Sequence, residues 1–111
     1  MKRSVRKVLI VLVTASGQKE AETIGQAVVK EKLAACVNIL SSVTSIFRWQ
    51  GKVQKSREAL LILKTTERRY RALERLIRAK HSYDVPEIIA LKLERGLSQY
   101  TAWVEQETTM G

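Results

Sequence analysis

The sequence predicts a single α+β domain over residues 1–111, with elements in the order βαββαβ and one further helix at the end. Two observations carry this prediction. Three short stretches are apolar at every position and rich in Val, Leu and Ile, which is typical of buried strands. Two longer stretches repeat apolar residues at helical spacing, and 111 residues leave room for one hydrophobic core.

The chain opens with a strand and a helix. Residues 8–13 read Val-Leu-Ile-Val-Leu-Val, so we expect a central strand that is buried on both faces. Ser16 or Gly17 is expected to cap the helix that follows over residues 19–32, with Glu20 in its first turn. The apolar residues of this helix recur at helical spacing: Ala21, Ile24 and Val28.

A long hairpin is predicted next. Residues 33–40 and 43–49 form two extended segments around Ser41-Ser42, and Gln50-Gly51-Lys52 supplies a tight turn. The return strand includes residues 59–63, again without polar alternation. We therefore expect it to lie inside the sheet.

The second half repeats the strand and helix pattern. Residues 68–80 predict an amphipathic helix capped by Thr66, in which Arg71, Arg75 and Arg78 lie on a solvated face. Glu67 and Glu74 are each placed for an i, i+4 partner on that helix.

The helix is predicted to end in a bend at His81-Ser82-Tyr83-Asp84-Val85, because Pro86 disfavours helical geometry at the preceding residue. Residues 87–93 form the fourth strand. Ser98 is expected to cap a last helix whose shared face carries Tyr100, Trp103 and Val104.

This order of elements predicts a ferredoxin-like domain, in which both crossover helices cover one face of a four-stranded antiparallel sheet. The other face needs a cover, because the strand-forming stretches 8–13, 59–63 and 88–91 are apolar at every position. Leaving an apolar side chain exposed forgoes roughly 1.5 to 3 kcal/mol. We therefore expect the sheet to pack against other copies of the chain.

Composition limits which partners and which cellular compartment we expect. The formal charge is +9, from 20 Lys and Arg against 11 Asp and Glu, but aromatic residues that could stack on bases are few. We expect neither nucleic-acid binding nor a membrane span, since no apolar run approaches the ~20 residues that a span needs. The basic residues 2–7 and the short apolar run after them resemble a signal peptide. We do not expect one, because its removal would delete the predicted first strand. With one cysteine and no internal disulfide, we expect a cytoplasmic protein.

The sequence has no P-loop, no dinucleotide-binding fingerprint, no paired-histidine zinc motif and no nucleophile elbow, so we expect no enzymatic activity. Cys36 stands between Ala35 and Val37 and is interpreted as a packing residue, with a nucleophile or ligand as the alternative. His81, the single histidine, is interpreted first as a hydrogen-bonding group of the bend and second as a ligand.

A group of polar residues could converge near the bend, where the third and fourth strands are expected to end. This group could form structural ion pairs across a subunit boundary, or it could bind a ligand; the sequence is compatible with both. Its members are Glu58, Lys64, Tyr83, Asp84 and Glu87.

Four ordered stretches identify a resemblance over residues 8–107: Lys32-Leu33-Ala34-Ala35-Cys36-Val37-Asn38, Trp49-Gln50-Gly51-Lys52, Leu61-Ile62-Leu63-Lys64-Thr65 and His81-Ser82-Tyr83-Asp84-Val85-Pro86-Glu87-Ile88. The chain resembles the CutA divalent-cation tolerance family. This resemblance implies a ferredoxin-like subunit in a homotrimer, similar in architecture to the PII signalling proteins. Such a trimer would cover the apolar sheet face.

The resemblance also implies the site residues. Copper or another divalent cation is the implied ligand, with His81 and Cys36 as the metal-binding candidates, and Glu58, Lys64, Tyr83 and Glu87 match the family's polar cluster at the subunit boundary. The chain departs from the family pattern at Val13, where some members have Cys, at Lys80, where they have His, and at Val53-Gln54-Lys55, where acidic residues are usual.

Two hypotheses follow. The leading one is a homotrimer of metal-ion tolerance or response that binds copper weakly. The alternative is a PII-like signalling module that holds a small anionic ligand in clefts between subunits.

Overall fold

The computed structural model describes residues 7–109, and the elements follow the predicted order with the predicted terminal helix. The basic residues 2–6 lie outside the described part. The strands are β1 Val8–Ala15, β2 Cys36–Trp49, β3 Lys52–Thr66 and β4 Ile88–Lys92, and the helices are α1 Gln18–Lys30, α2 Glu67–Lys80 and α3 Ser98–Glu107. The fold class is thereby confirmed as α+β.

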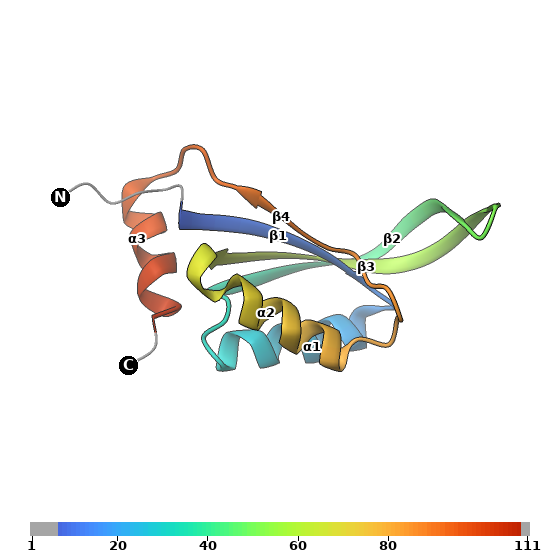
Figure 1. The fold of residues 1–111 in the computed structure, drawn as a ribbon, viewed down its shortest axis with the longest axis horizontal. Helices are drawn as coiled ribbons and strands as arrows, with labels where there is room; N and C mark the ends of the chain where they lie inside the picture. Colours follow the sequence, from blue (N-terminus) through green and yellow to red (C-terminus); the bar gives the residue numbers. More distant parts are fainter. Residues whose placement is uncertain (1–6, 110–111) are drawn as a thin grey trace.

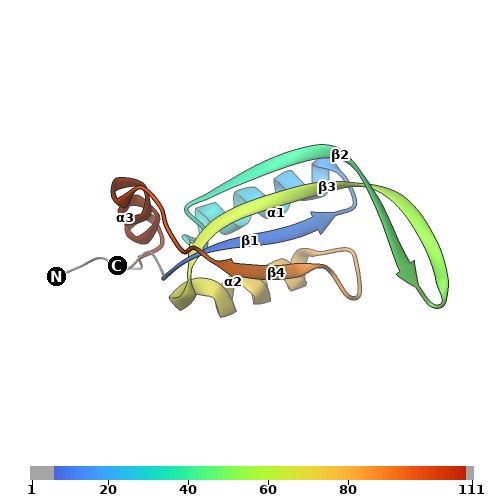
Figure 2. The same ribbon diagram turned by 90° about the horizontal axis from the view of Figure 1, so that it is seen from above.

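The four strands form one antiparallel sheet in the order β2-β3-β1-β4. Both crossover helices, α1 and α2, lie on the same side of this sheet (Figures 1 and 2). β1 is central, since Leu12 faces Ile62 of β3 on one side and Ile89 of β4 on the other. This is the ferredoxin-like arrangement that the order of elements predicts.

The hydrophobic core lies between the sheet and the two helices. Alternate residues of β1 and β3, such as Val11 and Leu63, are fully buried there. They pack with the inward side chains of α1 and α2, which include Ile24 and Ile77. Each such side chain contributes up to roughly 1.5 to 3 kcal/mol by its burial.

The opposite face of the sheet is open in one subunit. β1 was expected to be buried on both faces, but Ile10 and Leu12 are only half-buried, and in β4 Ile89 is 50% and Leu91 53% exposed. One subunit therefore leaves the outer face of β1 partly open, and burial on both faces stays a prediction for the assembly of copies. The physical reason is that α1 and α2 cover one face only, so the second apolar face needs a cover from outside the subunit.

The β2–β3 hairpin extends well beyond the body of the domain (Figures 1 and 2). Gln50 and Gly51 both have positive φ, 53° and 81°, which matches the two-residue turn between the paired residues Trp49 and Lys52. The two segments predicted around Ser41-Ser42 are one continuous strand with a register shift at that point. Such a bulge lets the ribbon bend without ending.

Helix α3 packs at one end of the sheet, where Val104 joins Val8 and Ala35 in a second small cluster. Tyr100 and Trp103 do not share its buried face and are 41% and 39% exposed. The rings of Tyr100 and Trp103 do contact each other, with centroids 5.6 Å apart, but of the three residues predicted on one face only Val104 is buried. The helix is preceded by Leu97 rather than capped by Ser98.

The other predicted cap residues occupy the expected positions, but they do not cap their helices through a side chain. Gly17 and Thr66 are the cap residues of α1 and α2; Gly17 has no side chain that could cap, and Thr66 makes no side-chain capping bond. The Thr66 hydroxyl instead lies 3.5 Å from that of Thr108. None of the helices among residues 7–109 is long and apolar enough to cross a membrane.

Candidate functional site

The bend between α2 and β4 is held by His81, whose two ring nitrogens both have partners. Nδ1 accepts a hydrogen bond from the Tyr83 N–H at 3.1 Å, and Nε2 lies 2.7 Å from the carbonyl oxygen of Thr14. Because a carbonyl can only accept, Nε2 must carry the ring proton. A metal ion would have to displace one of these partners to reach the imidazole, so the interpretation of His81 as a hydrogen-bonding group fits the geometry better.

Glu20 ties the start of α1 to the same bend. Its two carboxylate oxygens accept the N–H groups of Ser16 at 2.8 Å and Ser82 at 2.7 Å. Partial desolvation favours the neutral acid, but the hydrogen bonds from Ser16 and Ser82 outweigh it and lower the pKa of Glu20 to about 2. The sequence interpretation placed Glu20 only in a helical first turn and missed this contact.

Tyr83 connects the bend to strand β3. Its hydroxyl donates to Glu58 Oε2 at 2.8 Å, and Glu58 is only 7% exposed. Desolvation, together with the hydrogen bond to Glu58 and the negative charges of Glu58 and Glu20, raises the pKa of Tyr83 to about 12. The phenol is therefore a stable neutral donor to a buried carboxylate.

A cavity of about 730 Å³ opens between the hairpin, along residues that reach its tip at Trp49, and the bend. It contains three carboxylates, Glu58, Asp84 and Glu87, and among the described residues that line it there is no lysine or arginine. We call it the acidic hollow. Its lining is Thr14, Ser45, Ile46, Phe47, Trp49, Ser56, Glu58, Tyr83, Asp84, Val85 and Glu87.

Lys64 does not join this group within one subunit. It lies six residues after Glu58 on the same strand, which corresponds to about 20 Å at the rise of a β-strand. Its ammonium group donates to the side-chain oxygen of Asn38 on β2. The expected convergence is thus found for Glu58, Tyr83, Asp84 and Glu87, whereas Lys64 could meet them only from another subunit.

Cys36 lies beside Lys64 and far from His81. It is paired with Lys64 across β2 and β3, is half-buried, and its Sγ is 3.4 Å from the Tyr100 hydroxyl. The hydrogen bond with Cys36 and desolvation raise the pKa of Tyr100 to about 12. The two metal-binding candidates therefore cannot share one ion in a single subunit, and Cys36 is less buried than a core residue.

Comparison with known proteins gives the family. The family model described as "CutA1 divalent ion tolerance protein" matches residues 9–107. The chain belongs to this CutA1 family. The "Divalent-cation tolerance protein CutA" of Thermus thermophilus is 44% identical over 99 residues, which are 89% of this chain and 96% of that protein.

More distant members agree with this assignment. "Protein CutA, chloroplastic" of Arabidopsis thaliana is 40% identical over 90% of this chain, and the match spans about half (55%) of that longer protein. The crystal structure of CutA1 from Oryza sativa superposes with a TM-score of 0.91 at 38% identity and covers 97% of this chain and 100% of its own. The CutA1 fold thus extends over nearly the whole chain.

The family name concerns divalent ions, so the fit of the residues to a metal matters. Within residues 7–109 no group of three or more His, Cys, Asp or Glu side chains is arranged to hold a metal ion. The carboxylates of the acidic hollow line one cavity but do not converge on one point. Among residues 7–109, the metal-binding candidates His81 and Cys36 are therefore not part of such a group.

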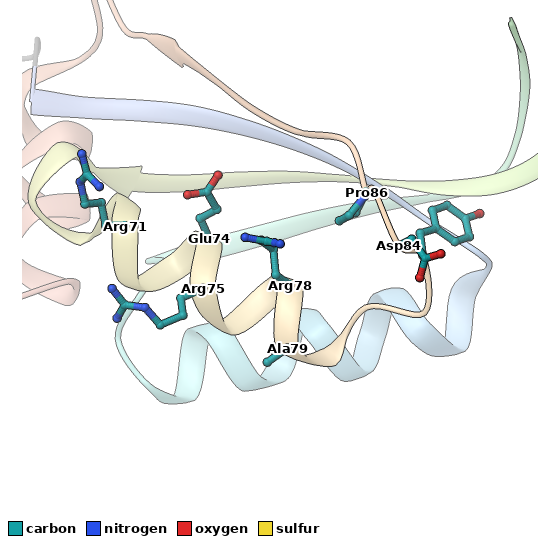
Figure 3. Close-up of a pocket in the computed structure, with 8 residues that line it drawn as sticks. Arg71, Glu74, Arg75, Arg78, Ala79, Asp84 and Pro86 are labelled. Atoms are coloured by element: carbon teal, nitrogen blue, oxygen red, sulfur yellow. The ribbon is translucent and has the colours of Figure 1, made fainter. Parts of the chain in front are cut away.

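A second hollow lies on the other side of the bend. It has a volume of about 430 Å³ and contains the three arginines of α2 that were expected on a solvated face. Figure 3 shows them on successive turns of the helix, with Asp84 and Pro86 on the segment that leads to β4. This arginine hollow is lined by Arg71, Glu74, Arg75, Arg78, Ala79, Tyr83, Asp84 and Pro86.

The three guanidinium groups are exposed, and in the described part of the chain none makes an ion pair with Glu74 or Asp84. Glu67, placed for an i, i+4 partner, instead pairs with Lys92 of β4 at 3.5 Å. Desolvation and the neighbouring Glu74 carboxylate raise the pKa of Tyr70, so Glu74 is engaged on its own helix. The arginines are therefore available to an anion from solution.

Sequence reasoning missed the aromatic side of the acidic hollow. Val43, Ser45, Phe47 and Trp49 are spaced two residues apart on β2, so their side chains point to the same face of the strand. Glu58 of β3 pairs with Val43 and therefore lies on that face too. The two-residue period of a strand was the signal that could have found them. The contact of His81 with Thr14 joins residues 67 positions apart and had no local signal.

Proposed function

We propose that this CutA1 family member acts without catalysis as a cytoplasmic homotrimer in tolerance of, or response to, divalent metal ions, and that it binds copper and related ions weakly. The observation that carries the proposal is the acidic hollow. Its described lining residues include three carboxylates and no lysine or arginine, although Asp84 also lines the arginine hollow, so a local negative potential is expected there in a chain of net charge +9.

Weak binding is the expectation because of the geometry. Copper normally requires two or more nitrogen or sulfur donors for tight binding, and His81 has both ring nitrogens engaged. The carboxylates Glu58, Asp84 and Glu87 are hard oxygen donors, which attract divalent cations through charge more than through a fixed coordination sphere. A loosely bound, exchangeable ion suits a response to excess metal.

The open sheet face supports the homotrimer. Leu40, Ile89 and Leu91 are about half exposed on the face that α1 and α2 leave uncovered. Burying such side chains against further copies removes apolar surface from water, at roughly 25 cal/mol per Å². The same assembly would bring Lys64 of one subunit toward Glu87 of the next, as the resemblance implies.

Calorimetric titration of the assembled protein with Cu²⁺ and Mn²⁺ at fixed pH tests the metal part. We expect a low-affinity isotherm for both ions that Glu58→Gln with Glu87→Gln weakens by about tenfold or more. The matched control is Glu94→Gln with Glu107→Gln, which removes the same charge from exposed residues outside the hollow. Equal weakening in both double variants would leave only a diffuse charge effect and would contradict the proposal.

The alternative function, binding of a small anionic ligand, is favoured by the arginine hollow. Arg71, Arg75 and Arg78 present donor forks suited to phosphate or carboxylate. The expected site differs from the one implied by the PII-like reading, because Lys64 and Glu87 do not line this hollow.

A screen of nucleotides against Arg71→Gln with Arg78→Gln tests this alternative. The control is Arg57→Gln with Arg95→Gln, which removes two exposed arginines elsewhere. Saturable nucleotide binding lost only in the first variant, together with no response to Cu²⁺ or Mn²⁺, would favour the signalling function over metal tolerance.

A further inference from the structure

The outer surface of helix α2 stays in water when the open face of the sheet is covered. Helices α1 and α2 lie on the opposite side of the sheet from that face (Figures 1 and 2). Copies that pack on Ile89 and Leu91 therefore leave the solvent side of α2 uncovered. Arg71, Arg75 and Arg78 are exposed on that side and line the arginine hollow. These arginines are thus accessible in an assembly formed through the sheet.

The three arginines form one stripe along α2. They stand at positions i, i+4 and i+7, which share one face of a helix. At a rise of 1.5 Å per residue, Arg71 and Arg78 lie about 10 Å apart along the helix axis. Figure 3 shows the side chains of Arg71, Glu74 and Arg78 rising from α2 on the side of the segment that carries Pro86. The stripe therefore offers guanidinium groups at two separated ends of one hollow.

Two carboxylates limit what a single small anion gains in this hollow. Glu74 stands between Arg71 and Arg78 on the helix, and Asp84 lines the hollow from the segment that leads to β4. Among the described lining residues, three guanidinium groups thus face two carboxylates, which leaves a small positive excess. Exposed charges are also screened by water and salt. One phosphate group alone is therefore expected to bind weakly.

Two phosphate groups on one ligand change this balance. When the first phosphate binds at one end of the stripe, the second meets the other end at a high effective concentration, provided that the spacing matches. A lone phosphate would contact both ends only by ordering two long arginine side chains inward, which costs rotamer entropy. A ligand with separated phosphates avoids that cost.

The carboxylates and the volume of the hollow indicate what joins the two phosphates. Ionised Glu74 and Asp84 only accept hydrogen bonds, so they suit the hydroxyl groups of a sugar-like compound. The volume of about 430 Å³ lies within the range of small-molecule sites, roughly 300 to 1,000 Å³. A continuous polyanion such as RNA fits less well, because the two carboxylates interrupt the basic stripe.

We infer that the arginine hollow binds a small polyhydroxylated compound with two separate phosphate groups, one at Arg71 and one at Arg78. Arg75 lies between the two positions on the same face of α2. The inference rests on the alternative function, anion binding in this hollow, and adds the class of anion.

The first test is calorimetric titration of the full-length protein at equal ionic strength with fructose 1,6-bisphosphate, fructose 6-phosphate and pyrophosphate. The bisphosphate has its phosphates at opposite ends of the sugar, the monophosphate lacks one of them, and pyrophosphate joins two directly. We expect the bisphosphate to bind about tenfold more tightly than either of the others. Equal affinities for the three compounds would overturn the inference.

The second test removes each end of the stripe. Arg71→Gln and Arg78→Gln should each weaken bisphosphate binding by about tenfold, to the level of the monophosphate. The matched control is Arg68→Gln, an exposed arginine of the same helix that does not line the hollow, and it should weaken binding by less than about twofold. Equal losses in the three variants would show a diffuse charge effect and would contradict the inference.

The outcomes separate this inference from the function on which it rests. Binding of nucleotides or pyrophosphate that depends on Arg71 but shows no preference for the bisphosphate overturns the inference and leaves anion binding in the hollow standing. Failure of all these compounds to bind overturns both. Binding of polyuridylate without bisphosphate binding overturns the inference in favour of a nucleic-acid surface. The proposal of metal tolerance is decided separately, by the titrations with Cu²⁺ and Mn²⁺.

Discussion

The Tyr83 hydroxyl donates a 2.8 Å hydrogen bond to Oε2 of Glu58, a carboxylate that is otherwise buried at the wall of the acidic hollow. Removing the donor by Tyr83→Phe should lower the free energy of unfolding by about 1 to 3 kcal/mol, because Glu58 keeps its desolvation cost without its partner. Urea unfolding measures the change. In a double-mutant cycle with Glu58→Gln the two losses should not add; additive losses would show that the bond contributes nothing.

The stabilisation by this hydrogen bond should be lost at high pH. The pKa of Tyr83 is raised to about 12 in the folded chain by desolvation and Glu58. Its contribution should therefore be complete below the pKa of an unfolded tyrosine, about 10, and fade as pH rises toward 12. Unfolding of the parent and of Tyr83→Phe at pH 8 and above pH 11 measures this, and a constant difference between them would contradict it.

The stabilisation by Glu20 should be lost in the acid range. Its pKa of about 2 lies below the ordinary value of 4.5, so its stabilisation is present above about pH 4.5 and is lost as pH falls toward 2. Glu20→Gln should therefore destabilise the protein at pH 7 and lose most of that effect near pH 2. Urea unfolding at both pH values tests this. Glu22→Gln, whose carboxylate bonds only the exposed Gln18 amide, is the control and should change stability little.

His81→Ala should act on the bend. It removes the contacts with Thr14 and Tyr83 and should lower the free energy of unfolding by about 1 to 2 kcal/mol while leaving the assembly intact. Chemical denaturation and copper calorimetry on the same preparation test this. Unchanged stability with copper binding abolished would mean that His81 is a ligand, as the family resemblance implies.

Ile89→Glu should disrupt the assembly, because Ile89 lies on the open apolar face of the sheet and is 50% exposed in one subunit. The parent protein should sediment near three times 12.6 kDa, and the variant as smaller species. Val29→Glu, on helix α1 and 40% exposed, is the matched control and should sediment like the parent. A monomeric parent would refute the argument from the open face.

The fold could be predicted because its signals are local. The apolar runs at residues 8–13 and 59–63 predict strands, and the spacing of Leu73 and Ile77 predicts a helix. Burial on both faces of β1 could not be decided, because one subunit covers only one face. The exposure of Tyr100 and Trp103 also escaped prediction, since α3 turns toward the small cluster of Val104, Val8 and Ala35.

The site was predicted only in part, for a physical reason. Tyr83, Asp84 and Glu87 are close in sequence, so their neighbourhood in space follows from the bend. Lys64 was grouped with them although a strand places it about 20 Å from Glu58. The use of both His81 nitrogens depends on the packing of the bend against β1, which no short-range pattern encodes.

Paramagnetic broadening by Mn²⁺ tests the central claim most directly, because it locates the ion on the protein in solution. The account predicts that the amide signals of Glu58, Tyr83, Asp84, Val85 and Glu87 broaden first, and that Glu58→Gln with Glu87→Gln removes this selectivity. Broadening centred on Cys36, or spread evenly over exposed carboxylates such as Glu94 and Glu107, would contradict the assignment of the acidic hollow as the site of divalent-cation binding.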